Sequence, residues 1–140
     1  MRVLHIGLED RLPYLGGAVD RAVSAFVRDV EQRGLSDEIL LIVTGEFGRT
    51  PKINKMAGRD HCSNLSTLAL AGGGLKMGQV VGESDRRVSF PVSDPVTPAN
   101  LLGTIMHSLF DIGTLQAAPG VPLEALSIVK TSEPISQLVT

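Results

Sequence analysis

The sequence predicts an α/β fold, with a layered, mostly parallel sheet flanked by helices, in a single domain over residues 1–140. Two observations predict it. The apolar runs at residues 38–43 (EILLIV) and 66–74 (STLALAGGG) have the continuous hydrophobicity of strands that are buried on both faces. A helical pattern precedes the first run and another follows the second, and this order is typical of layered α/β folds.

The first helix is expected between Gly17 and Gly34, where apolar residues recur at helical spacing and most charged residues fall on the other face. Gly34 is a good C-terminal stop. The second helix is expected within residues 97–113, with Thr97 as N-cap, Pro98 in the first turn and Gly113 as the end. Residues 78–84 could form a short hairpin arm, and the residues from 119 onward show no clear period.

Composition excludes several classes of protein. Hydrophobic residues make up 43% and charged residues 20%, which argues against disorder. A formal charge of -2 gives no electrostatic footprint for nucleic acid or an anionic membrane. The single cysteine, Cys62, excludes an internal disulfide, and no apolar run approaches the roughly 20 residues that span a bilayer. Because the first residues lack a long apolar segment, the chain as written is expected to be soluble and cytoplasmic.

A polar stretch, residues 44–61 (TGEFGRTPKINKMAGRDH), follows the first predicted strand. Ligands of open α/β sheets bind beyond the carboxyl ends of the strands, so this stretch is expected to form a site loop. Glu46, Asp60 and His61 offer oxygen and nitrogen donors that suit a divalent metal such as zinc or manganese. Arg49 could bind a phosphate or sulfate group through bidentate hydrogen bonds.

Each of these residues also has a structural interpretation. Glu46 could be a solvated turn carboxylate, Arg49 could pair with a neighbouring acid, and Asp60-His61 could be a turn. His107 lies beside the apolar stripe of its helix and is interpreted as structural, and Cys62 as a small packed residue. The glycines at 72–74 lack phosphate-loop spacing and are expected to allow a tight strand exit or a close backbone approach.

Three segments together carry a resemblance: residues 45–61 (GEFGRTPKIN to AGRDH), 69–85 (ALAGGGLKMGQVVGESD) and 95–113 (PVTPANLLGTIMHSLFDIG). They closely resemble the C-terminal part of the bacterial domain-of-unknown-function family 1501, which is placed in the alkaline phosphatase and sulfatase superfamily. The resemblance implies a metal-dependent hydrolase of phosphate or sulfate esters. It implies that Glu46 and His61 are metal ligands, with zinc or manganese preferred over calcium. Arg49 would bind the anion, and Asp60 would orient His61 or pair with Arg49.

The chain also departs from this family. Phe47 stands where a ligating histidine is expected, and Cys62 replaces an aromatic residue. From the resemblance, the segment that would carry the nucleophile is expected to be missing, and only His5 echoes an upstream Asp-Thr-His motif. One hypothesis is therefore a degenerate metal-dependent ester hydrolase that is inactive as this fragment. The other is a non-catalytic binding or assembly module.

Truncation of the fold predicts self-association, or a partner chain, through the uncovered face. No nucleic acid or membrane partner is expected. The resemblance also implies that related proteins are often exported.

Overall fold

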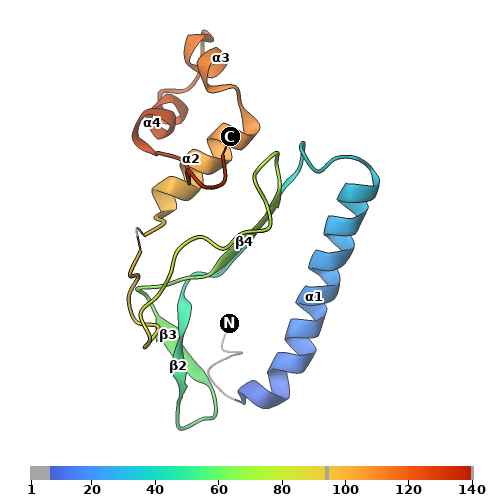
Figure 1. Ribbon diagram of the computed structural model, residues 1–140, viewed down its shortest axis with the longest axis vertical. Coiled ribbons are helices and arrows are strands. Elements are labelled where there is room, and N and C mark those ends of the chain that lie inside the picture. The colour runs from blue at the N-terminus through green and yellow to red at the C-terminus, as the bar shows by residue number, and fades with distance from the viewer. Residues whose placement is uncertain (1–6, 94, 140) are drawn as a thin grey trace. The chain divides into compact units, whose positions relative to one another are not determined.

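A computed structural model describes residues 7–93 and 95–139 (Figure 1). The chain divides into two compact units. The first contains residues 7–35, 42–69 and 83–93, and the second contains 36–41, 70–82 and 95–139. None of the helices in this described part combines the length and apolar character that a membrane crossing needs. The elements in order are α1 (Leu8–Gln32), β1 (Leu40–Thr44), β2 (Gly48–Ile53), β3 (Arg59–Cys62), β4 (Leu68–Gly72), α2 (Pro98–Leu109), α3 (Ile112–Ala117) and α4 (Leu123–Thr131).

Helix α1 begins at Leu8, earlier than its apolar pattern predicted. The backbone N–H groups of Gly7 and Leu8 donate to the carbonyls of Met56 and Ala57, at 3.0 and 2.8 Å. The first backbone N–H groups of a helix have no carbonyl partner within the helix, and these two bonds supply partners at the start of α1. The helix ends as predicted, because Gly34 adopts a φ of 70° just beyond it. The β2–β3 turn therefore fixes the start of α1.

The predicted layered, mostly parallel sheet is wrong. The described residues form two separate two-stranded sheets, one of β1 with β4 and one of β2 with β3. The second pair is antiparallel. The first is antiparallel as well, because Gly73 N–H donates to Ile39 near the start of β1 while Ser66 Oγ donates to Gly45 beyond its end.

A physical reason for this correction lies in the connection between β1 and β4. Parallel neighbours need a crossover of a dozen or more residues, usually a helix. Here the connecting residues pair with each other as the β2–β3 hairpin, and the chain then returns beside β1 in the opposite direction. Residues 78–84, considered as a hairpin arm, form only an isolated bridge between Ser84 and Pro91.

Helix α2 begins as predicted. The Thr97 side chain accepts a hydrogen bond from Asn100 N–H, and the Asn100 side chain accepts one from Thr97 N–H, which completes a capping box. The helix ends at Leu109 rather than at Gly113, because Phe110 is extended and Asp111 caps a new helix, α3. The tail without a clear period contains helix α4.

The core of the second unit forms where residues 132–139 lie against α2. Thr104 is fully buried, and its hydroxyl donates to Asn100 O and accepts from Ile135 N–H, both at 2.8 Å. Gly103 allows this approach, because a Cβ there would clash with the Ser132 carbonyl. Among the described residues, the buried hydrophobic side chains are Val30 in the first unit and Ile135 and Leu138 in the second.

The glycines at 72–74 behave as predicted. Each has a positive φ, between 67° and 82°, which residues with a side chain rarely adopt. The Gly73 N–H donates to the carbonyls of Ser36 and Ile39, at 2.7 and 3.0 Å. Its own carbonyl accepts from the Ser108 hydroxyl at 2.6 Å. The three glycines therefore provide a tight exit from β4.

Candidate anion-binding face

The polar stretch after β1 folds into a bend at residues 46–47 followed by the β2–β3 hairpin. Its register pairs Gly48 with Cys62, Arg49 with His61, and Ile53 with Arg59. Directly paired residues of two antiparallel strands project from the same face. Arg49 and His61, twelve positions apart in the chain, are therefore neighbours on one face of the hairpin.

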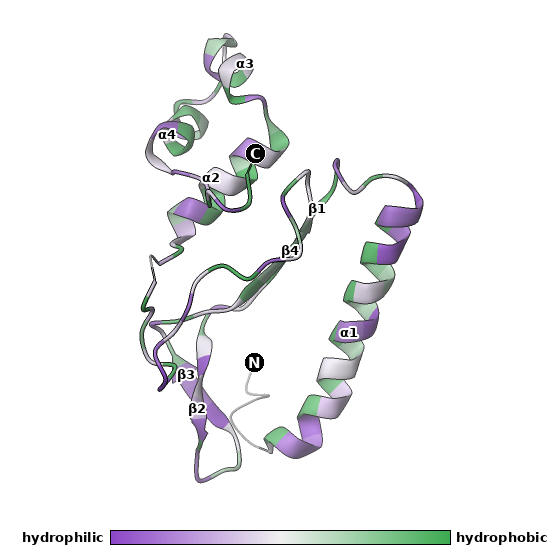
Figure 2. Ribbon diagram, in the orientation of Figure 1, coloured by the Kyte–Doolittle hydropathy of each residue, from purple (hydrophilic) through white to green (hydrophobic). Residues whose placement is uncertain are grey.

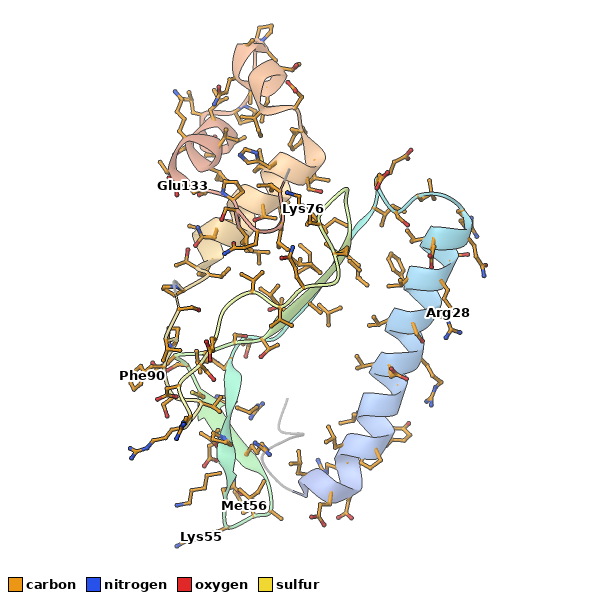
Figure 3. All side chains as sticks on the ribbon, viewed as in Figure 1. Arg28, Lys55, Met56, Lys76, Phe90 and Glu133 are labelled. Carbon is orange, nitrogen blue, oxygen red and sulfur yellow. The ribbon has the colours of Figure 1, made fainter. Side chains whose placement is uncertain are left out.

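A tight turn closes the hairpin. The Asn54 side-chain oxygen accepts hydrogen bonds from the N–H groups of Met56 and Gly58, at 2.9 and 3.0 Å. Such local bonds are the usual reason for Asn in turns. Ala57 adopts a φ of 54°, and Lys55 and Met56 lie at the tip (Figure 3). The turn shortens the connection between the strands and thereby fixes their register.

Phe47 contacts His61 directly. Their rings stack with centroids 4.9 Å apart and planes inclined by 28°. Phe47 is 43% exposed and His61 is also exposed, so the stack lies at the surface. Phe47 stands where the family resemblance implies a ligating histidine. Its ring instead positions the imidazole of His61, which is a predicted metal ligand.

Two arginines cross the hairpin. Arg49 Nη1 donates to the Arg59 carbonyl at 3.3 Å, and Arg59 Nη1 donates to the Thr50 carbonyl at 3.0 Å. Both residues are half-buried. The sequence pattern indicated Arg49 as a site residue but did not indicate Arg59. Strand alternation over 59–62 could have revealed Arg59, because residues two apart on a strand share a face.

Asp60 lies between Arg59 and His61 on β3, so its side chain projects from the opposite face of the hairpin. There its carboxylate accepts a hydrogen bond from Asn54 Nδ2 at 2.9 Å. Its backbone N–H donates to the Thr50 hydroxyl at 3.2 Å. The expected roles of Asp60, orienting His61 or pairing with Arg49, stay predictions.

Glu46 lies in the exposed bend before β2, and its carboxylate has no hydrogen bond or ion pair with the residues that the structure describes. The same described ranges contain no group of three or more His, Cys, Asp or Glu side chains that could hold a metal ion. A catalytic zinc site normally uses three protein ligands. The described residues therefore do not fit a complete catalytic metal site, and Glu46 with His61 stays a predicted pair. His5 lies outside the described residues.

Cys62 pairs with Gly48 in the register of the hairpin and is half-buried. Its thiol lies 3.8 Å from the Val88 carbonyl, in the segment 83–93. Val88 has an unusual φ of 52° for a β-branched residue. This contact agrees with the interpretation of Cys62 as a small packed residue.

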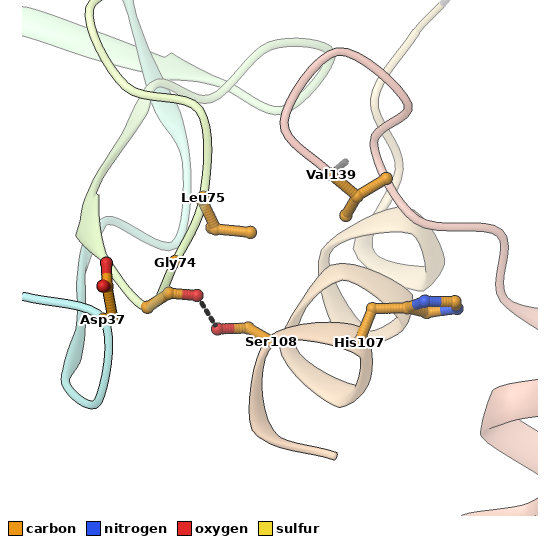
Figure 4. Close-up of a pocket in the computed structure, with 7 residues that line it drawn as sticks. Asp37, Gly74, Leu75, His107, Ser108 and Val139 are labelled. Carbon is orange, nitrogen blue, oxygen red and sulfur yellow. Dashed lines mark hydrogen bonds between the residues drawn. The ribbon is translucent and has the colours of Figure 1, made fainter. Parts of the chain in front are cut away.

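The second unit contains a hollow of about 260 Å³. Figure 4 shows Asp37 and His107 on opposite sides of it, while Ser108 donates its hydroxyl proton to the Gly73 carbonyl. His107 and Ser108 are adjacent on α2 and do not converge with Asp37. The lining contains no residue of the predicted site: it is formed by Asp37, Gly73, Gly74, Leu75, His107, Ser108 and Val139.

The comparison with protein families agrees with the motifs. A family model described as "Protein of unknown function (DUF1501)" matches residues 4–117. The chain belongs to the DUF1501 family. No curated protein and no solved structure matches it. The hairpin that carries Arg49, Arg59 and His61 lies within the segment matched by the DUF1501 model.

Proposed function

We propose that this DUF1501 chain binds anionic phosphate or sulfate esters on the β2–β3 hairpin. We further propose that the site descends from a metal-dependent ester hydrolase of the alkaline phosphatase and sulfatase type. The observation that carries the proposal is the cross-strand pair of Arg49 and His61. A guanidinium beside an imidazole offers N–H donors that match the oxygens of phosphate or sulfate.

The charge of the hairpin supports an anionic ligand. Residues 48–62 contain four cationic side chains and one carboxylate, a formal charge of +3, although the whole chain carries -2. The one carboxylate, Asp60, projects from the face opposite Arg49 and His61. The Arg49–His61 face is therefore the cationic face of the hairpin, where an anion gains the most electrostatic stabilisation.

Hydrolysis is limited by the small number of residues that could serve as metal ligands. Glu46 and His61 are the pair that we propose would contribute to a zinc or manganese site, and Glu46 adjoins Phe47, whose ring contacts His61. Hydrolysis would need further ligands and a nucleophile beyond these residues. We therefore expect the isolated chain to bind anions without turning over phosphate or sulfate esters.

Calorimetric titration with inorganic phosphate and sulfate tests the binding. Wild-type chain should bind saturably, and Arg49→Gln should weaken binding about tenfold or more, because a hydrogen bond to a charged group contributes about 1.5–3 kcal/mol. Lys52→Gln is the matched control, since Lys52 is an exposed cation of the same strand. Equal losses in both variants would indicate general charge attraction and contradict a site at Arg49.

A second pair of assays tests the link to hydrolysis. With zinc or manganese added, p-nitrophenyl phosphate and p-nitrophenyl sulfate should remain uncleaved. Turnover that disappears in His61→Ala would contradict the expectation of an incomplete site. Metal retention should fall in a Glu46→Ala, His61→Ala double variant, and unchanged metal affinity in that variant would contradict their role as ligands.

A second candidate function is assembly through helix α1. Leu12, Leu15, Val19, Ala22 and Phe26 alternate at spacings of three and four residues, as in helices that pair with other helices. Tyr14, Val19 and Leu12 remain 79%, 54% and 49% exposed. Figure 2 shows apolar positions recurring along α1. We propose a second copy of this chain as the occupant, because a two-helix seam needs an equally long apolar stripe on its partner.

Sedimentation of wild type and a Leu12→Glu, Val19→Glu double variant tests this assembly. The wild type should form a dimer at micromolar concentration and the double variant a monomer. A comparable change on the polar side of α1, Arg21→Glu with Arg28→Glu, should leave the dimer intact. A monomeric wild type at high micromolar concentration would contradict self-association. The anion site would be unaffected by that result.

A further inference from the structure

The hairpin face carries two features that the anion site alone does not use, the Phe47–His61 stack and the guanidinium of Arg59. We propose that this face selects aryl esters, with the stacked rings contacting the aromatic group and Arg59 joining Arg49 on the oxyanion. The inference rests on the proposed function and names the substrate class of the same site. Arg59 would act as a binding and specificity residue.

The register places Arg59 on the cationic face. Arg59 and His61 are two residues apart on β3, and His61 is paired directly with Arg49. The irregularity of the hairpin falls on β2, between Arg49 and Ile53, so the alternation of β3 is kept. Arg49, Arg59 and His61 therefore project from the same face, with the guanidiniums on neighbouring strands.

Both arginines are held by backbone bonds. Arg49 reaches the Arg59 carbonyl and Arg59 reaches the Thr50 carbonyl, so each side chain bridges the two strands. Fixing a long side chain before the ligand arrives reduces the entropy that binding would otherwise cost. A guanidinium carries five N–H donors, and one of those of Arg59 makes the Thr50 bond. Two fixed guanidiniums suit a ligand group with three or four oxygens, such as a phosphate or sulfate ester.

The stacked rings of Phe47 and His61 contact the organic group of the ester, while the arginines contact its oxyanion. Phe47 and His61 stack face to face, both residues are exposed, and His61 is paired with Arg49 in the register. A further aromatic ring can extend such a stack through offset stacking, which a short alkyl group cannot reproduce. A ligand that joins a planar ring directly to an oxyanion would contact both features at once. Aryl phosphates and aryl sulfates have this chemistry.

The test compares phenyl phosphate, methyl phosphate and inorganic phosphate by calorimetry, in the presence of a chelator so that no metal contributes. Phenyl phosphate should bind about three- to tenfold more tightly than methyl phosphate, the size of an aromatic pair contribution. Phe47→Leu should remove this preference, so that phenyl phosphate and methyl phosphate bind with equal affinity. Phe47→Tyr, which keeps the ring, should retain the preference.

Arg59→Gln should weaken all three ligands about tenfold, and Arg59→Lys should restore only part of the loss, because lysine keeps the charge without the planar fork. Arg86→Gln, an exposed arginine outside the hairpin, is the control.

Equal affinity of wild type for phenyl and methyl phosphate would overturn the inference, as would a preference that survives in Phe47→Leu. Full affinity in Arg59→Gln would overturn the role of Arg59. If inorganic phosphate binds and depends on Arg49 but the ring has no effect, only this inference fails. If inorganic phosphate does not bind at all, the proposed function fails with it.

Discussion

The ring of Phe47 stacks on the imidazole of His61, with centroids 4.9 Å apart. This contact ties the bend that follows β1 to strand β3. Phe47→Ala should therefore lower the free energy of unfolding by about 1 kcal/mol, the usual contribution of an aromatic pair. The control is Phe90→Ala, because Phe90 is 59% exposed. Equal losses in chemical denaturation would show that the stack contributes nothing beyond the exposed ring.

Gly48 is expected to tolerate no side chain. A Cβ at this position would overlap the carbonyl oxygen of Leu65, to which the Gly48 N–H donates at 2.6 Å. Gly48→Ala should cost about 1–3 kcal/mol, because backbone must move to accommodate the methyl group. Gly45→Ala is the matched control, since the nearest atom to its added Cβ would be 3.7 Å away. Thermal unfolding of the two variants measures the difference, and similar midpoints would contradict the close approach.

Thr104 should stabilise the second unit through its hydroxyl. Thr104→Val keeps the shape but leaves the buried N–H of Ile135 without its acceptor, which should cost about 1–3 kcal/mol. Thr131→Val removes a hydroxyl bond of the same length, 2.8 Å to Ser127 O, from an exposed helix position. That control should change stability little. If urea denaturation gives the same loss for both, burial of Thr104 is not the cause.

Asp111 should titrate at unusually low pH. The Thr114 backbone N–H donates to its carboxylate at 2.7 Å, and this bond, with a second from the Thr114 side chain, holds the pKa of Asp111 below the usual 3.8. Because the folded pKa is lowered, capping of α3 is fully present above about pH 3.8 and is lost as the pH falls through the lower folded value.

An NMR titration that follows the Thr114 amide measures this pKa. Wild type should show a midpoint below 3.8. Thr114→Val, which keeps the backbone bond, should raise the midpoint toward that value without reaching it. Asp111→Asn should remove the transition. A wild-type midpoint at or above 3.8 would contradict the capping bond.

Local features of this chain could be predicted from sequence. The capping box of Thr97 and Asn100, the stop at Gly34 and the strand exit at residues 72–74 depend on neighbouring residues alone. The direction of the two apolar strands could not be predicted, because an apolar run indicates burial without indicating which neighbour it pairs with or in which direction.

The β2–β3 hairpin could not be predicted, because its composition lacks the usual signals of a strand. Residues 48–62 have no apolar alternation, and Pro51 argues against a regular strand because it lacks an N–H. The structure accommodates Pro51 in the irregular part of β2, between Arg49 and Ile53. The pairing of Arg49 with His61 depends on the register of the β2–β3 hairpin. The spacing of the two residues in the chain could therefore suggest a site but not its geometry. Arg59 was missed because strand β3, on which it shares a face with His61, was not predicted.

The hairpin face that bears Arg49, Arg59 and His61 is proposed to bind an oxyanion. The most direct measurement is an amide NMR titration with inorganic phosphate, compared between wild type and Arg49→Gln. We expect saturable shifts concentrated in residues 47–61, with an affinity that falls about tenfold or more in the variant. Shifts concentrated instead around Asp37 and Ser108, or an affinity unchanged by Arg49→Gln, would contradict the account.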